Sequence, residues 1–237
     1  QALAGIPAYY RFEEGSGTTV LNSATGVSNG AHGAAYSSDV PISPIPQTGA
    51  GNGFSLAFNN IASANYTGPD FILHAGYGAA TLEFWIKAPD QPHSSIFWTR
   101  PDTVDSNRFN ISINPGGALN VDYRDPSAGL HELLSGSTFV ITPDTWTHIA
   151  ITRQIDSASQ HTYDFYRNGS LVATAIDSNP DLPTANGWTI SGRTVAGFQM
   201  DGLIDEVRFS DTALSPSGFL NAAAPIPEPR TIVLMGW

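Results

Sequence analysis

The acidic side chains of this sequence are the first candidates for chemistry, because paired carboxylic acids can break glycosidic bonds. Retaining glycosidases need two carboxyl groups about 5–5.5 Å apart. Glu13 and Glu14 are adjacent, so a strand would point them to opposite faces, and Asp201, Asp205 and Glu206 do not provide the required spacing. The chain also has no Cys, and therefore no thiol nucleophile. We expect that the protein is not an enzyme.

Asp205 is the most informative of these acids. In the stretch 202–209, strict alternation places it on the apolar face together with Leu203. An ionised carboxylate in such a place needs a partner. One interpretation is an ion pair with Arg11 or Arg208, or a set of hydrogen bonds from backbone N–H groups.

The other interpretation of Asp205 is a structural Ca²⁺ ion between the first and last strands. Ca²⁺ prefers about six to eight hard oxygen ligands. Glu14 and Asn22 supply side-chain oxygens near the start of the chain, and residues 13–17 supply backbone carbonyl groups in a tight turn. A calcium site formed by Glu14, Asn22 and Asp205 is therefore the second interpretation that the sequence allows.

Aromatic side chains suggest a second kind of site, because a sugar ring can stack on an exposed aromatic ring while neighbouring polar side chains bond its hydroxyl groups. The candidate ligand-binding residues are Trp98, Tyr123, Arg124 and Trp188, and Asp122 lies beside two of them in the sequence. The alternative is that these rings pack in the core or on a sheet surface.

The elements that would position these residues are short strands. Segments of β-branched and aromatic residues alternate with clusters of Gly, Asn, Asp, Ser and Pro, which is typical of strands joined by turns, and we find no helical period of useful length. Asn168-Gly169 supplies the two positive φ angles of a type I′ hairpin, and Gly116-Gly117 separates two apolar segments in a similar way. The predicted strands are 8–13, 54–58, 80–87, 95–100, 108–113, 118–124, 147–154, 162–167, 170–176, 188–191 and 202–209.

Alternation with period two indicates which faces turn inward. Leu82, Phe84 and Ile86 share one face of the segment 81–87, which predicts a half-buried antiparallel strand. So many strands without intervening helices predict two packed sheets, because a single sheet would leave an apolar face in water. We therefore expect an all-β fold, a two-sheet antiparallel β-sandwich of the jelly-roll type.

The charge of the chain restricts its partners. It has 237 residues with 21 acidic and 10 basic side chains, which gives a formal charge of −11. Without a basic run, nucleic acids are not expected as partners, and anionic membrane surfaces are disfavoured. The apolar residues 232–235 are far fewer than the about 20 that span a bilayer, so we expect no membrane span.

The end of the chain differs from its body. We divide the sequence into a domain at residues 1–221, a Pro-rich linker at 222–230 and an apolar, β-forming tail at 231–237. The prolines favour an extended, polyproline-like linker. Alone, the tail would be a sticky strand, and it can dock as an added strand on its own sandwich or on a neighbour's edge. The candidate assembly residues are Thr231, Ile232, Val233, Leu234 and Met235.

Several segments, in order, resemble the laminin-G-like, concanavalin A-like jelly-roll superfamily of bacterial surface proteins. They are 10–20, 81–87, 146–152 with 165–169, and 201–209 with 213–215. The resemblance implies a jelly roll over residues 8 to about 220, and a structural Ca²⁺ is consistent with it. Glycosidases of this superfamily typically carry Glu-x-Asp-x-x-Glu on one strand, and this pattern is missing here.

The sequence Ile226-Pro227-Glu228-Pro229 with the apolar residues after it resembles a truncated PEP-type C-terminal sorting signal. This resemblance implies a secreted or cell-surface protein of a Gram-negative bacterium. We therefore expect a non-enzymatic, exported structural or adhesive protein that binds a polysaccharide or a matrix component. The alternative is a self-assembling homo-oligomer, a subunit of an extracellular filament or layer with the tail as a docked strand. A polysaccharide-active enzyme is the third interpretation.

Overall fold

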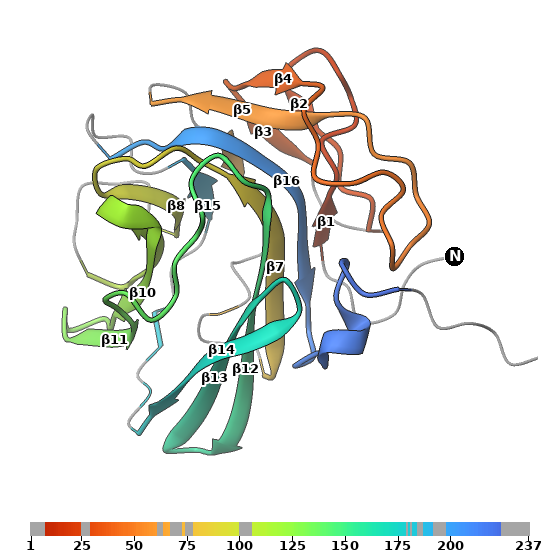
Figure 1. Ribbon diagram of the computed structural model, residues 1–237. Coiled ribbons are helices and arrows are strands. Elements are labelled where there is room, and N and C mark those ends of the chain that lie inside the picture. Colours follow the sequence, from red (N-terminus) through yellow and green to blue (C-terminus); the bar gives the residue numbers. More distant parts are fainter. Residues whose placement is uncertain are drawn as a thin grey trace, which may run out of the picture.

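The protein folds into two antiparallel β-sheets that face each other (Figure 1). The computed structural model describes residues 8–24, 29–60, 64–66, 73, 78–99, 106–178, 180, 182–183, 187–191 and 198–223. Within these residues each sheet contains eight strands, and the helical elements are two short 3₁₀ turns, η1 (Pro115–Gly117) and η2 (Pro216–Gly218). The predicted all-β, two-sheet antiparallel fold is confirmed.

The first sheet, sheet A, contains the longest strands. Its last strand in the sequence lies in its middle, because β16 pairs with both β7 and β5. β1 pairs with β16 as well, so the start and the end of the domain lie side by side. The order is β14 (Ser170–Asp177), β13 (Gln160–Arg167), β12 (Thr147–Ser157), β7 (Ala80–Lys87), β16 (Asp201–Ser210), β5 (Ser55–Asn59) and β4 (Ala35–Ser37), with β1 (Ala8–Tyr10) beside β16.

The second sheet, sheet B, combines two strands of seven residues and two of five with four strands of two or three. The order is β11 (Leu130–Leu134), β10 (Ala118–Arg124), β9 (Arg108–Asn114), β8 (Ser94–Trp98), β15 (Trp188–Ile190), β6 (Ala64–Tyr66), β3 (Gly30–His32) and β2 (Thr19–Val20). Nothing in the described part of the chain forms a helix with the length and apolar character needed to cross a bilayer.

Both turns expected from the sequence are present. Asn168 and Gly169 have φ angles of 50° and 81° and connect β13 to β14. Gly116 and Gly117, with φ angles of 79° and 76°, connect β9 to β10. A Cβ atom at Gly117 would lie only 2.1 Å from the carbonyl oxygen of Ile141, so this position requires glycine for space as well as for conformation.

The interior between the sheets follows the predicted alternation. Leu82, Phe84 and Ile86 on β7 are fully buried, and they share one cluster with Ile149 and Ile151 on β12. The register aligns Ile149 with Phe84 and Ile151 with Leu82, so the two strands present one continuous apolar layer to sheet B.

The outer face of sheet A is also buried, so the expectation of a half-buried strand at 81–87 is wrong. The chain that follows β16 packs over this face. Leu220 lies in one cluster with Trp85, and Phe219 packs against Ala150 and Tyr166. This segment, residues 211–222, therefore acts as a cover over the middle of sheet A.

Glu83 lies beneath this cover and is fully buried. Its carboxylate accepts hydrogen bonds from Nε2 of His148 (2.9 Å), from Nε of Arg208 (2.7 Å) and from the backbone N–H of Leu220 (2.7 Å). Burial alone would raise the pKa of Glu83, but the hydrogen bond from His148 and the charge of Arg208 outweigh it and lower this pKa. Glu83 thereby ties the cover to the sheet.

Candidate functional site

The outer face of sheet B is polar because polar and apolar residues alternate along its central strands. On β9, Phe109 and Ile111 lie in the core, so Asn110 between them turns outward. The register places Asn110 directly opposite Asp122 on β10, and Asn120 lies two residues away on the same face. The result is an array of amide and carboxylate groups on neighbouring strands.

Asp122 is the centre of this array. Its carboxylate accepts hydrogen bonds from Nδ2 of Asn110 (2.8 Å) and of Asn120 (3.0 Å), and it forms an ion pair with the guanidinium of Arg108. The guanidinium carbon of Arg108 lies 4.6 Å from the ring centroid of Trp98, within the range of cation–π contacts. Because both carboxylate oxygens are bonded, the array is held in one arrangement.

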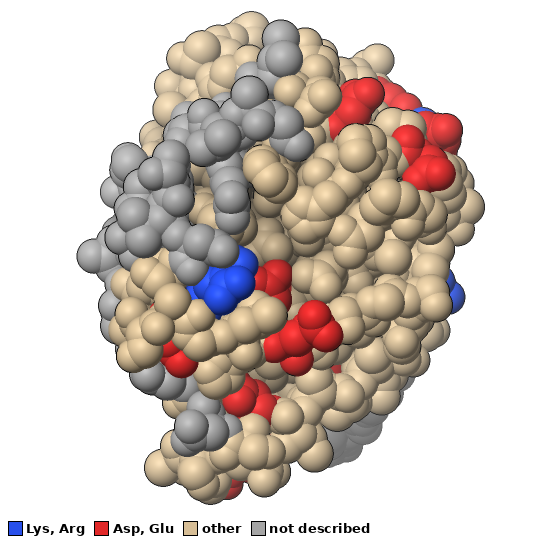
Figure 2. All heavy atoms as spheres, turned by 90° about the vertical axis from the view of Figure 1, so that its left-hand side faces the viewer, with Lys and Arg blue, Asp and Glu red and all other residues tan. Residues whose placement is uncertain are grey.

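The rim of the array is accessible. Asn120 and Arg124 are half-buried, and Glu132 on β11 is exposed. Arg124 lies opposite Arg108 in the register and donates a hydrogen bond to the carbonyl of Ala128 (2.9 Å). Figure 2, which views the side on which β8, β10 and β11 lie, shows basic side chains beside acidic ones in a mostly uncharged surface. Fixed amide, guanidinium and carboxylate groups of this kind can recognise hydroxyl groups.

Three of the four predicted ligand-binding residues are buried, so the prediction of an exposed aromatic platform is wrong. Tyr123 faces the core and donates a hydrogen bond to Asp177. Trp188 also lies in the core cluster, and Trp98 lies beneath the guanidinium of Arg108. A ring in these positions cannot stack on a sugar that arrives from solvent. Arg124, the fourth predicted residue, lies on the outward face.

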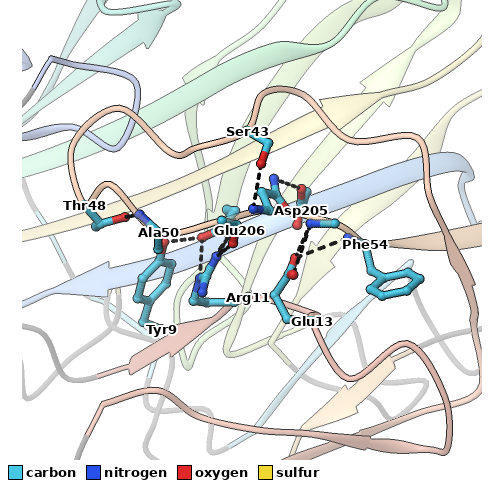
Figure 3. A network of polar contacts seen from close by, with 12 residues as sticks. Tyr9, Arg11, Glu13, Ser43, Thr48, Ala50, Phe54, Asp205 and Glu206 are labelled. Atoms are coloured by element: carbon cyan, nitrogen blue, oxygen red, sulfur yellow. Dashed lines mark hydrogen bonds and ion pairs between the residues drawn. The ribbon is translucent and has the colours of Figure 1, made fainter.

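A second polar network joins the first and last strands (Figure 3). β16 has a bulge between Asp205 and Arg208, where Glu206 adopts a φ angle of 52°. Strict alternation therefore fails here, and both Asp205 and Glu206 are fully buried. Glu206 accepts hydrogen bonds from Nε of Arg11 (3.1 Å) and from the hydroxyl of Tyr9.

The predicted ion pair between Asp205 and Arg11 or Arg208 is wrong, because these arginines bind Glu206 and Glu83 instead. Asp205 accepts a hydrogen bond at Oδ2 from Nδ2 of Asn52 (2.8 Å). Burial raises the pKa of Asp205 to about 9, and the nearby charge of Glu206 acts in the same direction.

The predicted calcium ligands Glu14 and Asn22 have other partners. Glu14 accepts hydrogen bonds from the backbone N–H of Leu21 (2.7 Å) and from the hydroxyl of Tyr36 (3.1 Å). Oδ1 of Asn22 accepts two backbone N–H groups, each at 3.0 Å. Among the residues that the structure describes, no group of three His, Cys, Asp or Glu side chains could hold a metal ion.

Around Asp205, however, other oxygen atoms are available. Oδ1 of Asp205 and Oδ1 of Asn52 are buried and have no well-formed hydrogen bond, although the backbone N–H of Glu206 lies close enough to Asp205 to lower its pKa. The carboxylate of Glu13 lies near enough to act on the pKa of Asp205, and it accepts the backbone N–H groups of Gly53 and Phe54, next to Asn52. This donor set of carboxylate and amide oxygens fits a hard cation. Asn52 was missed because an Asn in a Gly-rich loop carries no periodic signal.

The predicted assembly residues 231–235 and the linker from residue 224 onward lie outside the described residues.

The two-sheet antiparallel topology and the connections described above define a concanavalin A-like jelly roll. A family model described as "Concanavalin A-like lectin/glucanases superfamily" matches residues 59–218, and the chain belongs to this family, Laminin_G_3. No curated protein matches the chain.

Solved structures with the same fold include several binding domains. Domain 4 of AbnA, a GH43 extracellular arabinanase from Geobacillus stearothermophilus in complex with arabinotriose, is 18% identical with a TM-score of 0.62, covering 90% of this chain and 95% of that one. The receptor-binding domain of botulinum neurotoxin D is 13% identical with a TM-score of 0.60, covering 90% of this chain and 50% of that one. The binding domain of Paraclostridial Mosquitocidal Protein 1 is 14% identical with a TM-score of 0.59, with coverages of 90% and 50%. The chain thus spans about half the length of these toxin domains, and at such identities the likeness establishes the fold alone.

Proposed function

We propose that this protein binds a polysaccharide or glycan through the outer face of sheet B. The observation that carries this proposal is the half-buried side chain of Asn120, which the buried array of Arg108, Asn110 and Asp122 holds in one arrangement beside the half-buried Arg124. Rigid polar groups lose little conformational entropy when they bond sugar hydroxyls. The arabinotriose complex of a domain with the same fold supports the choice of ligand class.

Binding to an arabinan, a xylan and a β-glucan tests this proposal, measured by affinity electrophoresis and calorimetry. We expect Asn120→Ala and Arg124→Ala each to weaken binding at least tenfold, because both side chains lie at the rim. Gln154→Ala on β12 is the matched control, since Gln154 is exposed on the other sheet. Loss of affinity in the control, or unchanged affinity in both rim variants, would contradict the proposed site.

We propose binding rather than catalysis, although one pair of acids needs consideration. Asp122 and Glu132 lie directly opposite each other on β10 and β11. Asp122 is buried and both of its oxygens are engaged, while Oε1 of Glu132 accepts a hydrogen bond from Ser135 (2.7 Å). A carboxylate bonded by three donors is a poor acid or base. Release of reducing sugar by the purified protein, lost in Glu132→Gln, would favour the polysaccharide-active enzyme instead.

The proposal includes export to the cell surface, where the protein would be structural or adhesive. This part depends on the resemblance of residues 226–229 to a PEP-type sorting signal. Fractionation of the producing cells tests it, with the protein expected in the medium or the surface fraction and not with cytoplasmic markers.

We further propose that Ca²⁺ is bound by Asp205, Asn52 and Glu13 rather than by Glu14 and Asn22. The buried Oδ1 atoms of Asp205 and Asn52 support this choice, because a buried polar atom without a well-formed hydrogen bond costs about 1–3 kcal/mol. The ion would join the first segment, the loop at residue 52 and the last strand.

Thermal unfolding with excess Ca²⁺ or with a chelator tests the calcium proposal. Ligand at 100 times its Kd stabilises by about 2.7 kcal/mol, which corresponds to a rise in Tm of roughly 5–11 °C for a domain of this size. Asp205→Asn should abolish the rise, and Glu14→Gln should keep it. Equal Tm values of the unmodified protein in both solutions would overturn the proposal.

A further inference from the structure

β14 differs from the other edges of the two sheets. Among the described strands, those at an end of a sheet are β14, β4, β1, β11 and β2, and β14 is the longest of these with eight residues, against three, three, five and two. Figure 1 shows β14 at the border of sheet A beside β13. An edge strand presents unpaired N–H and C=O groups that can pair with another strand. The length of β14 makes this edge the largest template for such pairing.

Two of the usual protections of an edge, Lys and Pro, are missing from β14, which retains one inward-pointing charge. Proteins block edges with Lys, with Pro or with inward-pointing charges, but the sequence Ser-Leu-Val-Ala-Thr-Ala-Ile-Asp contains no Lys, Arg or Pro. Its single charge, Asp177, is buried and accepts a hydrogen bond from Tyr123 on the opposite sheet. The edge β11, by comparison, exposes the carboxylate of Glu132.

Two large aliphatic side chains stand exposed on β14. Leu171 is 56% exposed and Ile176 is 61% exposed. A bulge at residue 172 sets their register, so that Leu171 lies opposite Tyr166 and Ile176 opposite Thr162. This places both on the outer face of sheet A, one near each end of the strand.

We propose that β14 is a dimerisation edge, on which a second copy of this chain pairs through its own β14. In an antiparallel pair about a two-fold axis near Thr174, Leu171 of each copy lies toward Ile176 of the other. The arrangement is self-complementary, as an isologous contact must be. Two copies with a charge of −11 repel each other over most of their surface, and this edge, whose one charged residue is buried, is where they can approach.

Sedimentation velocity over a range of concentrations tests the proposal. The unmodified protein should dimerise, and Leu171→Lys and Ile176→Lys should each weaken the dimer at least tenfold, because each places like charges at the contact. Both side chains are exposed, so the fold tolerates the changes. Leu130→Lys, at a residue 54% exposed on β11, is the control and should still dimerise. A monomer at all concentrations, or a dimer insensitive to both variants, would overturn the proposal.

A cross-link tests the geometry directly, because the chain has no Cys. Thr174→Cys should form a disulfide-linked dimer on mild oxidation, and Ser37→Cys on the opposite edge β4 should not. Equal cross-linking of the two variants would contradict the pairing of β14. Loss of the dimer on deletion of residues 224–237, with the β14 edge intact, would overturn the proposal in favour of the tail.

Discussion

Glu83 shows how one buried side chain can determine both stability and its pH dependence. Glu83→Gln keeps the shape but leaves Arg208, which is also buried, without a counter-charge. Breaking a buried ion pair in this way costs about 3–5 kcal/mol. Urea unfolding at neutral pH should therefore show a large loss, and Glu132→Gln, an exposed control, should change stability by less than about 0.5 kcal/mol.

The pH dependence of Glu83 has a definite sign. Its pKa is lowered in the folded state, so its contribution is present above the unfolded pKa of about 4.3 and is lost as the pH falls through the lower folded value. The stability of Glu83→Gln should thus fall less steeply than that of the unmodified protein below about pH 4.5. Parallel curves for the two proteins would show that Glu83 is not the titrating group.

At the level of single residues, alternation predicted the core-facing side chains of β7 but neither the burial of its outer face nor the partners of the buried acids. It predicted that Asp205 is buried but not on which face, because the register sets Asp205 opposite Trp85 on the outer face while Ile204 lies in the core. Its partner Asn52 is 153 positions away and lies in a loop. The error at Tyr123 was avoidable, because Leu119 and Val121 alternate with it and mark the inner face. The burial of Trp98 was harder to predict, because a bulge in β8 between Ser95 and Phe97 breaks the alternation there.

At the level of elements, the turn between β9 and β10 gives a matched pair of variants. Gly116→Ala and Gly117→Ala both place a side chain at a positive φ angle, which costs about 1–2 kcal/mol. At Gly116 nothing lies within 4 Å of the new Cβ, whereas at Gly117 it meets the carbonyl oxygen of Ile141. We expect Gly117→Ala to have a clearly lower Tm than Gly116→Ala. Equal Tm values would mean that the backbone shifts to relieve the contact.

The length of each strand explains which strands the sequence could predict. β7, β9, β10 and β12 have seven or more residues and show alternation. β2, β3, β4 and β6 have two or three residues and β11 has five, and none of them was predicted, because segments so short show little or no period. Their place is fixed by pairing with distant strands, which local sequence does not encode.

At the level of the whole molecule, the two-sheet architecture followed from the number of strands and the lack of helices. The cover at residues 211–222 did not, since it depends on Phe219 and Leu220 meeting strands far away in the sequence. The acidic charge predicts that nucleic acids and anionic surfaces are not partners of this protein. The match of residues 59–218 to the concanavalin A-like superfamily agrees with the observed fold.

The central position of β16 has a consequence for biosynthesis. Sheet A has its last-made strand between β7 and β5, so a chain still emerging from the ribosome lacks the middle of this sheet until residue 210 has been synthesised. Contacts between segments so far apart form late and slowly. We therefore expect the domain to fold only after nearly all of residues 8–210 have been synthesised.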